Sequence, residues 1–218
     1  KDVLDLINQF MKPNTIFIDV GANIGTISQP IGALWKKSNV LVHSFEASND
    51  IYNSLKANIM LNNLENITAH NLAITDFNGS LTFNEVSSNS KNRGLSSILD
   101  NSDLQDSFKT EVEAKKLDSM SDQFSLPISV IKIDVQGAEL SVIKGALSLI
   151  KKNKPIIVFE HEDRYHQDTK KIKKELEDIF NSLSYKVFKF NEDKETVLYR
   201  EDFNGYVESN LIAIPINK

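Results

Sequence analysis

The sequence contains no cysteine among its 218 residues. This absence excludes disulfide bonds, thiolate metal sites and a cysteine nucleophile. No apolar run approaches the roughly 18 residues of a membrane-spanning helix, so we expect no membrane span. A signal peptide is also missing, and we expect a cytoplasmic protein. The chain opens on Lys1 rather than Met, so whether a leader or a further domain precedes it is left open.

The chain also has no excess of positively charged residues. The chain carries 25 lysine and arginine residues against 30 aspartate and glutamate residues, for a formal net charge of −5. This balance argues against a protein that binds nucleic acid or an anionic membrane through its overall charge, although it is compatible with a local basic patch. Hydrophobic residues make up 40% of the chain and charged residues 25%, which is typical of a folded protein with a buried core.

Short β-branched segments alternate with amphipathic helical segments along most of the chain. This alternation predicts an α/β fold with a doubly wound, mostly parallel sheet. We expect one domain over residues 1–218, with an N-terminal helix within residues 1–12. Residues 79–117 differ, because Gly79–Val86 and Thr110–Leu117 alternate apolar and polar residues as antiparallel strands do. The Ser- and Asn-rich residues 87–101 between them predict a mobile loop.

Core elements can be assigned by residue range. Strands are expected at residues 15–20, 40–45, 67–74, 129–135, 155–159, 185–190, 196–199 and 211–216. Helices are expected at residues 24–37, 51–61, 139–150 and 169–183. Pro30 should kink or break the first of these helices. In the last one, Lys170, Lys171, Lys173 and Lys174 are expected to face solvent.

A buried strand runs into a glycine turn and then a helix at residues 17–25 (FIDVGANIG). Glycine permits positive φ and close approach of a ligand, and a helix N-terminus suits a carboxylate or phosphate. The Gly-x-Gly-x-x-Gly spacing of a dinucleotide site is absent, because Asn23 stands at the middle glycine position. Asp19 would also lie badly beside a pyrophosphate but suits an ammonium group. The turn therefore favours a zwitterionic amino-acid moiety.

A second carboxylate, Glu46, follows the next strand, 27 residues after Asp19. In a doubly wound sheet this carboxylate lies beside the first turn, where it can accept both hydroxyls of a ribose. An amino-acid site next to a ribose site describes S-adenosylmethionine, and we predict this cofactor.

Four segments resemble the FkbM family of S-adenosylmethionine-dependent methyltransferases: FIDVGANIG (17–25), SFEAS (44–48), LAITDFNGSLTF (72–83) and IKIDVQGAELSVIKGA (131–146). The resemblance runs from about Thr15 to Phe190. It implies a Rossmann-like sheet of seven strands with the last strand antiparallel. It also implies methyl transfer, usually to a hydroxyl oxygen of a sugar, glycan or secondary metabolite. The chain departs from the family pattern at Ala47, where Pro is frequent, and at Gln136, where Glu is frequent.

The resemblance also assigns roles within the site. The residues of the glycine turn would hold the methionine end, Glu46 the ribose, and the end of the third strand the adenine. The candidate cofactor-binding residues are Asp19, Gly21, Ala22, Asn23, Gly25, Glu46, Ala47, Leu72, Ala73 and Asp134.

Methyl transfer to a hydroxyl needs an aligned acceptor and a base within hydrogen-bond reach. The strand ends at the carboxyl edge of the sheet are the natural places for such a base. We predict His161 and Asp134 as the catalytic residues, since a neutral imidazole near pH 7 can take a proton. Lys132, on the same strand face as Asp134, is expected to neutralise a carboxylate such as Asp19, Asp134 or Glu160.

Further acids and histidines lie nearby in sequence. Glu139 suits the first turn of a helix better than catalysis. The run Glu160-His161-Glu162-Asp163 could hold a divalent metal, but its spacing is a weak signal. We therefore predict no metal site and leave the use of a metal open.

The expected partner is a small molecule or glycan that carries a hydroxyl group. Neither the acceptor nor the oligomeric state follows from the sequence. Three alternatives remain: a nucleic-acid ribose methyltransferase, which the acidic balance disfavours; a nicotinamide-dependent dehydrogenase, which the glycine spacing disfavours; and a non-catalytic binding module that keeps the fold.

Overall fold

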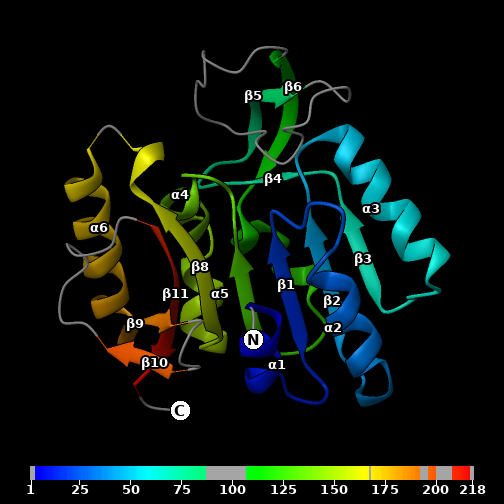
Figure 1. Cartoon of the computed structure of the whole chain (residues 1–218), viewed down its shortest axis with the longest axis horizontal. Coiled ribbons are helices and arrows are strands. Elements are labelled where there is room, and N and C mark those ends of the chain that lie inside the picture. The colour runs from blue at the N-terminus through cyan, green and yellow to red at the C-terminus, as the bar shows by residue number, and fades with distance from the viewer. Residues whose placement is uncertain (1–2, 87–106, 167, 192–195, 200–207, 217–218) are drawn as a thin grey trace.

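A computed structural model describes residues 3–86, 107–166, 168–191, 196–199 and 208–216. Its main sheet has eight strands in the order β10-β9-β11-β8-β7-β1-β2-β3. Helices α1, α2 and α3 pack on one face of this sheet, and α4, α5 and α6 pack on the other (Figure 1). Each group of three helices covers one of two buried hydrophobic clusters. The predicted loop at residues 87–101 lies outside the described residues.

The elements have the following bounds. The helices are α1 (Val3–Phe10), α2 (Ser28–Trp35), α3 (Asn49–Leu61), α4 (Glu139–Lys144), α5 (Leu147–Asn153) and α6 (Thr169–Ser182). The strands of the main sheet are β1 (Ile16–Val20), β2 (Leu41–Phe45), β3 (Ile67–His70), β7 (Ile128–Ile133), β8 (Ile156–Glu162), β9 (Tyr185–Asn191), β10 (Thr196–Tyr199) and β11 (Glu208–Pro215). The strands of the second sheet are β4 (Ala73–Ile74), β5 (Gly79–Val86) and β6 (Ser107–Lys115).

The strand pairings confirm the predicted α/β class. Strands β3, β2, β1, β7 and β8 pair in parallel, and the last strand, β11, lies antiparallel between β8 and β9. These seven strands form the expected sheet, and β10 adds an eighth at its edge. All residues of β1 and β7 are buried, which explains why these strands are mostly apolar, since a central parallel strand is covered on both faces.

The predicted strand at residues 67–74 is two strands in the structure. β3 ends at His70, and β4 turns away to pair with β6 in the second sheet. Asn71 causes the break, because its side-chain amide donates to the backbone oxygens of Glu46 and Ala47, both at 3.0 Å. In the second sheet β5 and β6 pair antiparallel, as predicted for the region 79–117.

Pro30 neither kinks nor breaks a helix, contrary to the prediction. α2 begins at Ser28 rather than near residue 24, so Pro30 is the third residue of the helix. The first four N–H groups of a helix have no intrahelical acceptor, and a proline there removes no hydrogen bond.

The helix predicted over residues 139–150 is also two helices, α4 and α5. Gly145 separates them and packs so tightly that a Cβ added there would lie 2.0 Å from the Thr75 backbone oxygen. The Asp118 carboxylate then accepts hydrogen bonds from Ser148 N and Leu149 N, both at 2.9 Å, at the start of α5. A residue distant in sequence therefore caps the second helix, and no local pattern encodes this.

We expect Asp118→Ala to lower the free energy of unfolding by about 1–2 kcal/mol, because it removes both acceptors from the first turn of α5. Urea denaturation followed by circular dichroism measures the change. Asp122→Ala is the matched control, since Asp122 lies exposed in the same 3₁₀ segment. Equal effects of the two substitutions would contradict the capping role.

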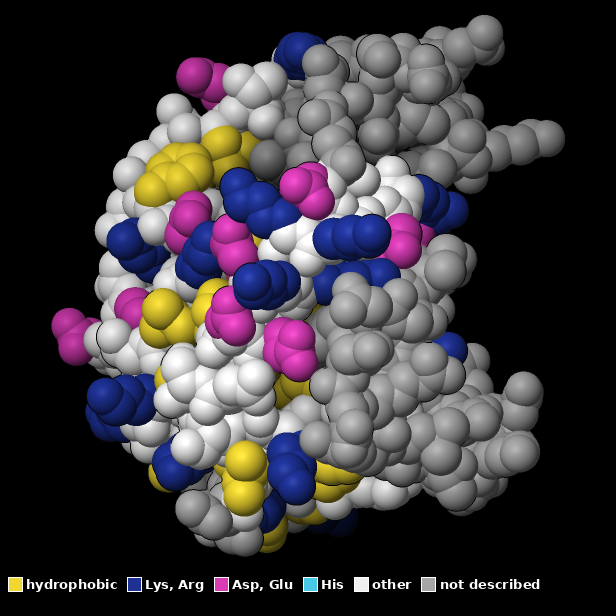
Figure 2. Space-filling model, turned by 90° about the vertical axis from the view of Figure 1, so that its left-hand side faces the viewer, with side chains coloured by type: hydrophobic (Ala, Val, Ile, Leu, Met, Phe, Trp, Pro, Cys, Tyr) yellow, Lys and Arg dark blue, Asp and Glu magenta, His cyan; other side chains and the backbone are white. Residues whose placement is uncertain are grey.

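α6 is amphipathic, and basic and acidic side chains are interspersed on the face of the molecule that includes it (Figure 2). Lys173 corrects the prediction that four lysines of this helix face solvent. Its side chain is buried, and its ammonium lies 2.8 Å from Asp163 Oδ1. Within the described ranges, no helix combines the length and the hydrophobicity needed to cross a membrane.

Candidate cofactor and active site

A cavity of about 250 Å³ opens at the carboxyl edge of the main sheet, where β1, β2, β7 and β8 end. Its lining combines residues of the glycine loop (21–25), apolar side chains and acidic side chains. It is lined by Val20, Gly21, Asn23, Phe45, Glu46, Ala47, Ile51, Leu72, Ala73, Ile74, Asp134, Val135, Gln136 and Glu160. Six predicted cofactor-binding residues besides Asp134 are therefore brought together: Gly21, Asn23, Glu46, Ala47, Leu72 and Ala73.

Three residues of the glycine loop have positive φ: Gly21, Asn23 and Gly25. Gly21 has φ +74°, and a Cβ there would lie 1.9 Å from the Asp134 backbone oxygen, so only glycine lets β1 leave the sheet so close to β7. Asn23 has φ 51°, and its side-chain oxygen accepts a hydrogen bond from Ile24 N at 2.7 Å. This local bond stabilises a conformation that most side chains avoid.

Glu46 links this loop to the second strand. Its Oε2 accepts a hydrogen bond from Asn23 N at 3.0 Å, and its Oε1 accepts one from Ser48 N at 2.9 Å. Burial raises the pKa of Glu46, and the two backbone N–H groups oppose that rise. Each carboxylate oxygen has two lone pairs, so the group can hold the loop and still accept hydroxyl groups from the cavity.

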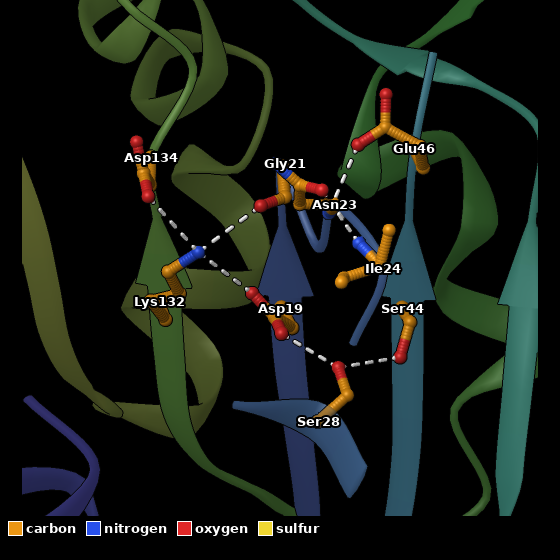
Figure 3. A network of polar contacts seen from close by, with 9 residues as sticks. All are labelled: Asp19, Gly21, Asn23, Ile24, Ser28, Ser44, Glu46, Lys132 and Asp134. Carbon is orange, nitrogen blue, oxygen red and sulfur yellow. Dashed lines mark hydrogen bonds and ion pairs between the residues drawn. The ribbon is translucent and has the colours of Figure 1, made fainter. Parts of the chain in front are cut away.

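Asp19 does not contact the cavity, although it was predicted to hold a ligand ammonium. It is 0% exposed, and its carboxylate accepts a hydrogen bond from Ser28 Oγ at 2.6 Å and lies 3.1 Å from Lys132 Nζ. Its ammonium partner is therefore a side chain of the protein. Asp19 supports the site from beneath rather than lining it (Figure 3).

Lys132 confirms the prediction that it neutralises carboxylates. Its ammonium donates to the Gly21 backbone oxygen at 3.1 Å and lies 3.4 Å from Asp134 Oδ2, in addition to its pair with Asp19. Burial alone would lower the pKa of Lys132, but the Asp19 and Asp134 carboxylates raise it above its ordinary value. Figure 3 shows the ammonium joining the ends of β1 and β7.

A second cavity of about 290 Å³ adjoins the first and reaches toward α1, α2 and β11. Its lining includes Ala22, a predicted cofactor-binding residue, together with Thr26 and Lys132. Four residues line both cavities and mark their junction: Gly21, Asn23, Asp134 and Glu160. Gly25 lines neither cavity; it packs instead beside Gln29 and Leu55.

Glu160 is the residue that sequence reasoning missed as a site residue. Burial, followed by the charge of the Asp134 carboxylate, raises the pKa of Glu160 to about 8. The signal was present in the sequence, because Glu160 directly follows the predicted strand at 155–159 as Asp134 closes the strand before it.

His161, the predicted base, is not brought to either cavity. It follows Glu160 on β8 and therefore points to the opposite face of the sheet. It is 0% exposed, with Nε2 3.1 Å from Asp163 Oδ1 and its ring stacked on His166. Burial, followed by the neighbouring His166, lowers its pKa. The geometry thus gives His161 a packing role behind the site.

Glu139 behaves as the sequence predicted. It lies in the first turn of α4 and accepts a hydrogen bond from Gly137 N at 2.9 Å. Burial raises its pKa to about 7, but it lines neither cavity. Among the residues that the structure describes, no three His, Asp or Glu side chains are grouped so that they could hold a metal ion.

Comparisons with known proteins find methyltransferases that are similar to this chain in sequence or in fold. The chain is 24% identical over 152 residues to "Methyltransferase 1" of Beauveria bassiana, covering 61% of this chain and 58% of that protein. A crystal structure of methyltransferase FkbM from Methylobacillus flagellatus matches with a TM-score of 0.59 and 18% identity, covering 93% of this chain and 44% of that one. This chain thus spans less than two thirds of either protein.

A proposed methyltransferase from Streptococcus mutans, solved in complex with S-adenosylhomocysteine (SAH), matches with a TM-score of 0.52 and 10% identity. The match covers 97% of this chain and 93% of that one. The model of the methyltransferase FkbM domain matches residues 19–190, which include the end of β1, the glycine loop, Glu46, Asp134 and Glu160. The chain therefore belongs to the FkbM methyltransferase family.

Proposed function

We propose that this protein is an S-adenosylmethionine-dependent methyltransferase that methylates a hydroxyl oxygen. The observation that carries the proposal is the first cavity, whose lining combines the Glu46 carboxylate, the glycine loop that is hydrogen-bonded to it, and apolar side chains. Family membership supports it, and so does the bound SAH in a protein with the same fold.

The residues present fit the two halves of this cofactor. Glu46 Oε2 accepts a hydrogen bond from Asn23 N and Oε1 accepts one from Ser48 N. Because a carboxylate offers about four lone-pair sites, the group can also accept hydrogen bonds from ribose hydroxyls. Ile51, Leu72 and Ile74 offer an apolar surface for the adenine. Gly21 and Asn23 of the glycine loop also line the cavity, and the amino-acid half would lie along this loop.

The bound cofactor would supply a methyl group on a sulfonium, which is transferred by in-line displacement. Most of the protein's contribution would be alignment, since a well-oriented acceptor gains much of the rate from proximity alone. Asp134 lies at the junction of the two cavities with 41% of its side chain exposed, where it can accept the acceptor's hydroxyl proton. Lys132 holds this carboxylate in place.

For the acceptor we propose a sugar, glycan or secondary metabolite that carries a hydroxyl. The second cavity supports this class, because Thr26, Asn210 and Glu160 give it hydrogen-bonding groups beside apolar ones. Hydroxyl-rich ligands bind through such mixed surfaces. A soluble location in the cytoplasm remains part of the proposal.

Isothermal titration calorimetry with S-adenosylmethionine, SAH and NAD⁺ tests the cofactor. We expect micromolar binding of the first two and none of NAD⁺, because the loop lacks the dinucleotide glycine spacing. Binding of NAD⁺ alone, or of none of the three, would overturn the proposal. Binding of SAH without transfer to any member of a panel of hydroxylated sugars and metabolites would instead support a non-catalytic module.

A further inference from the structure

Asp134 and Glu160 occupy equivalent positions on neighbouring strands. In the parallel pairing of β7 with β8, Lys132 lies opposite Val158 and Ile133 opposite Phe159, so Asp134 and Glu160 come next in register. Both residues line both cavities, and the charge of the Asp134 carboxylate acts on the Glu160 carboxyl beside it. Two carboxylates that share a site repel each other, so a single proton held by the pair relieves the repulsion.

The charges around the pair favour such sharing. Glu162 and Glu139 add negative charge near Glu160, and its own carboxyl is more than half buried. On the other side, Lys132 offsets the charges of Asp19 and Asp134 only in part, because it is one cation between two carboxylates. Tyr165 also lies near Glu160, and Asn210 faces it from β11. The described surroundings therefore disfavour a second negative charge on the pair.

The pair lies where a bound cofactor would carry its positive sulfur. This step rests on the proposed function, with the adenosine half in the first cavity and the amino-acid half along the glycine loop. The sulfonium joins the two halves, so it would lie near the residues common to both cavities, among them Asp134 and Glu160.

We propose that Asp134 and Glu160 share one proton in the free site and release it when a sulfonium cation binds, so that the pair distinguishes the charged methyl donor from its uncharged thioether product. S-adenosylmethionine and SAH differ by one methyl group and by this one positive charge. A cation beside the pair stabilises its fully ionised form, whereas a thioether leaves the shared proton in place.

The sign of the pH dependence follows from this exchange. Glu160 has a pKa of about 8, so near pH 7 roughly 0.9 of the sites carry the shared proton. A ligand that favours the ionised pair then releases up to about 0.9 proton per molecule bound. At pH values below the pKa, the affinity for this ligand increases by up to about tenfold for each unit by which the pH is raised. A ligand that is indifferent to the pair shows neither effect.

Calorimetry in two buffers of different ionisation enthalpy measures the protons released on binding. Near pH 7 we expect at least about half a proton released per S-adenosylmethionine bound, and close to none for SAH. From about pH 6.5 to about pH 8.5 the affinity for S-adenosylmethionine should increase severalfold more than the affinity for SAH. Measuring the difference between the two ligands cancels titrations that both share, such as those of their amino groups.

Glu160→Gln removes the titrating group and keeps a donor toward Asp134, so it should abolish the proton release and the difference in pH dependence while SAH still binds. Glu139→Gln is the control, because Glu139 is also a buried acid with a raised pKa but lines neither cavity. The charge of Glu139 is the smallest of the named influences on the pKa of Glu160, so most of the release should remain.

Equal proton release for both ligands, or release that persists in Glu160→Gln, would overturn the inference and leave the cofactor assignment standing. Loss of the release in Glu139→Gln but not in Glu160→Gln would also overturn it. Binding of neither ligand to the unsubstituted protein would overturn the proposed function itself, and the inference with it.

Discussion

Glu46→Ala is expected to weaken binding of SAH by about 100-fold. Two hydrogen bonds from ribose hydroxyls to a carboxylate contribute about 1.5–3 kcal/mol each, and loss of about 3 kcal/mol corresponds to a factor of this size. The substitution also removes the acceptor for Asn23 N and Ser48 N, which lie at 3.0 and 2.9 Å from the carboxylate. We therefore expect lower thermal stability and a less ordered loop. Calorimetry and thermal denaturation measure the two effects.

Two further variants separate ribose binding from loop support. Glu46→Gln retains one side-chain oxygen as an acceptor and should lose only about tenfold in affinity. Glu65→Ala replaces an exposed glutamate on the loop before β3 and should change neither property. If folded Glu46→Ala bound SAH as tightly as the unsubstituted protein, the ribose assignment would be wrong.

Lys132→Met is expected to lower the free energy of unfolding by about 3–5 kcal/mol. Breaking a buried ion pair from one side leaves an uncompensated charge, and here the Asp19 carboxylate is fully buried. The loss is large compared with the total stability of about 5–15 kcal/mol that is typical of a domain. The backbone oxygen of Gly21 would also lose its donor, so SAH binding should weaken as well.

Urea denaturation followed by circular dichroism measures this prediction. Lys144→Met is the control, because Lys144 pairs with Glu175 at a half-exposed position and should barely move the urea midpoint. Adding Asp19→Asn to Lys132→Met should recover part of the lost stability, since the buried charge is then absent. A single variant as stable as the unsubstituted protein would show that the pair is dispensable.

Much of the site follows from local sequence. The strand at 16–20, the positive-φ turn and the acid after the second strand are encoded by an apolar run, glycines and spacing, and Glu46 indeed lies beside the loop. The family could be identified for the same reason, because the segments that resemble it are contiguous in the sequence.

The sequence indicated that Lys132 pairs with a carboxylate such as Asp19. It did not indicate that this pairing keeps Asp19 away from the cavity. A lysine inside a buried strand predicts a nearby carboxylate, and Lys132 has two. Lys132 and Ser28 together hold Asp19 away from the cavity. This arrangement depends on the register of β1 against β7. Register is a property of the assembled sheet, set by packing on both of its faces.

The local sequence did not decide whether Glu160 or His161 lines the site. Alternation along β8 dictates that the two side chains point to opposite faces, and a sequence alone does not tell which face holds the site. The assembled sheet decides, because α6 covers the face of His161 through Asp163 and Lys173, while Glu160 meets Asp134 at the open edge.

The sequence by itself determined the α/β class, the glycine turn, the ribose-binding candidate and the family, because each depends on residues close together in the chain. Only the tertiary structure decided that Asn71 ends β3, that Asp118 starts α5, and that Glu160 rather than His161 lines the site. These three outcomes depend on contacts between residues far apart in sequence, whose strength comes from burial and geometry that only the folded chain creates.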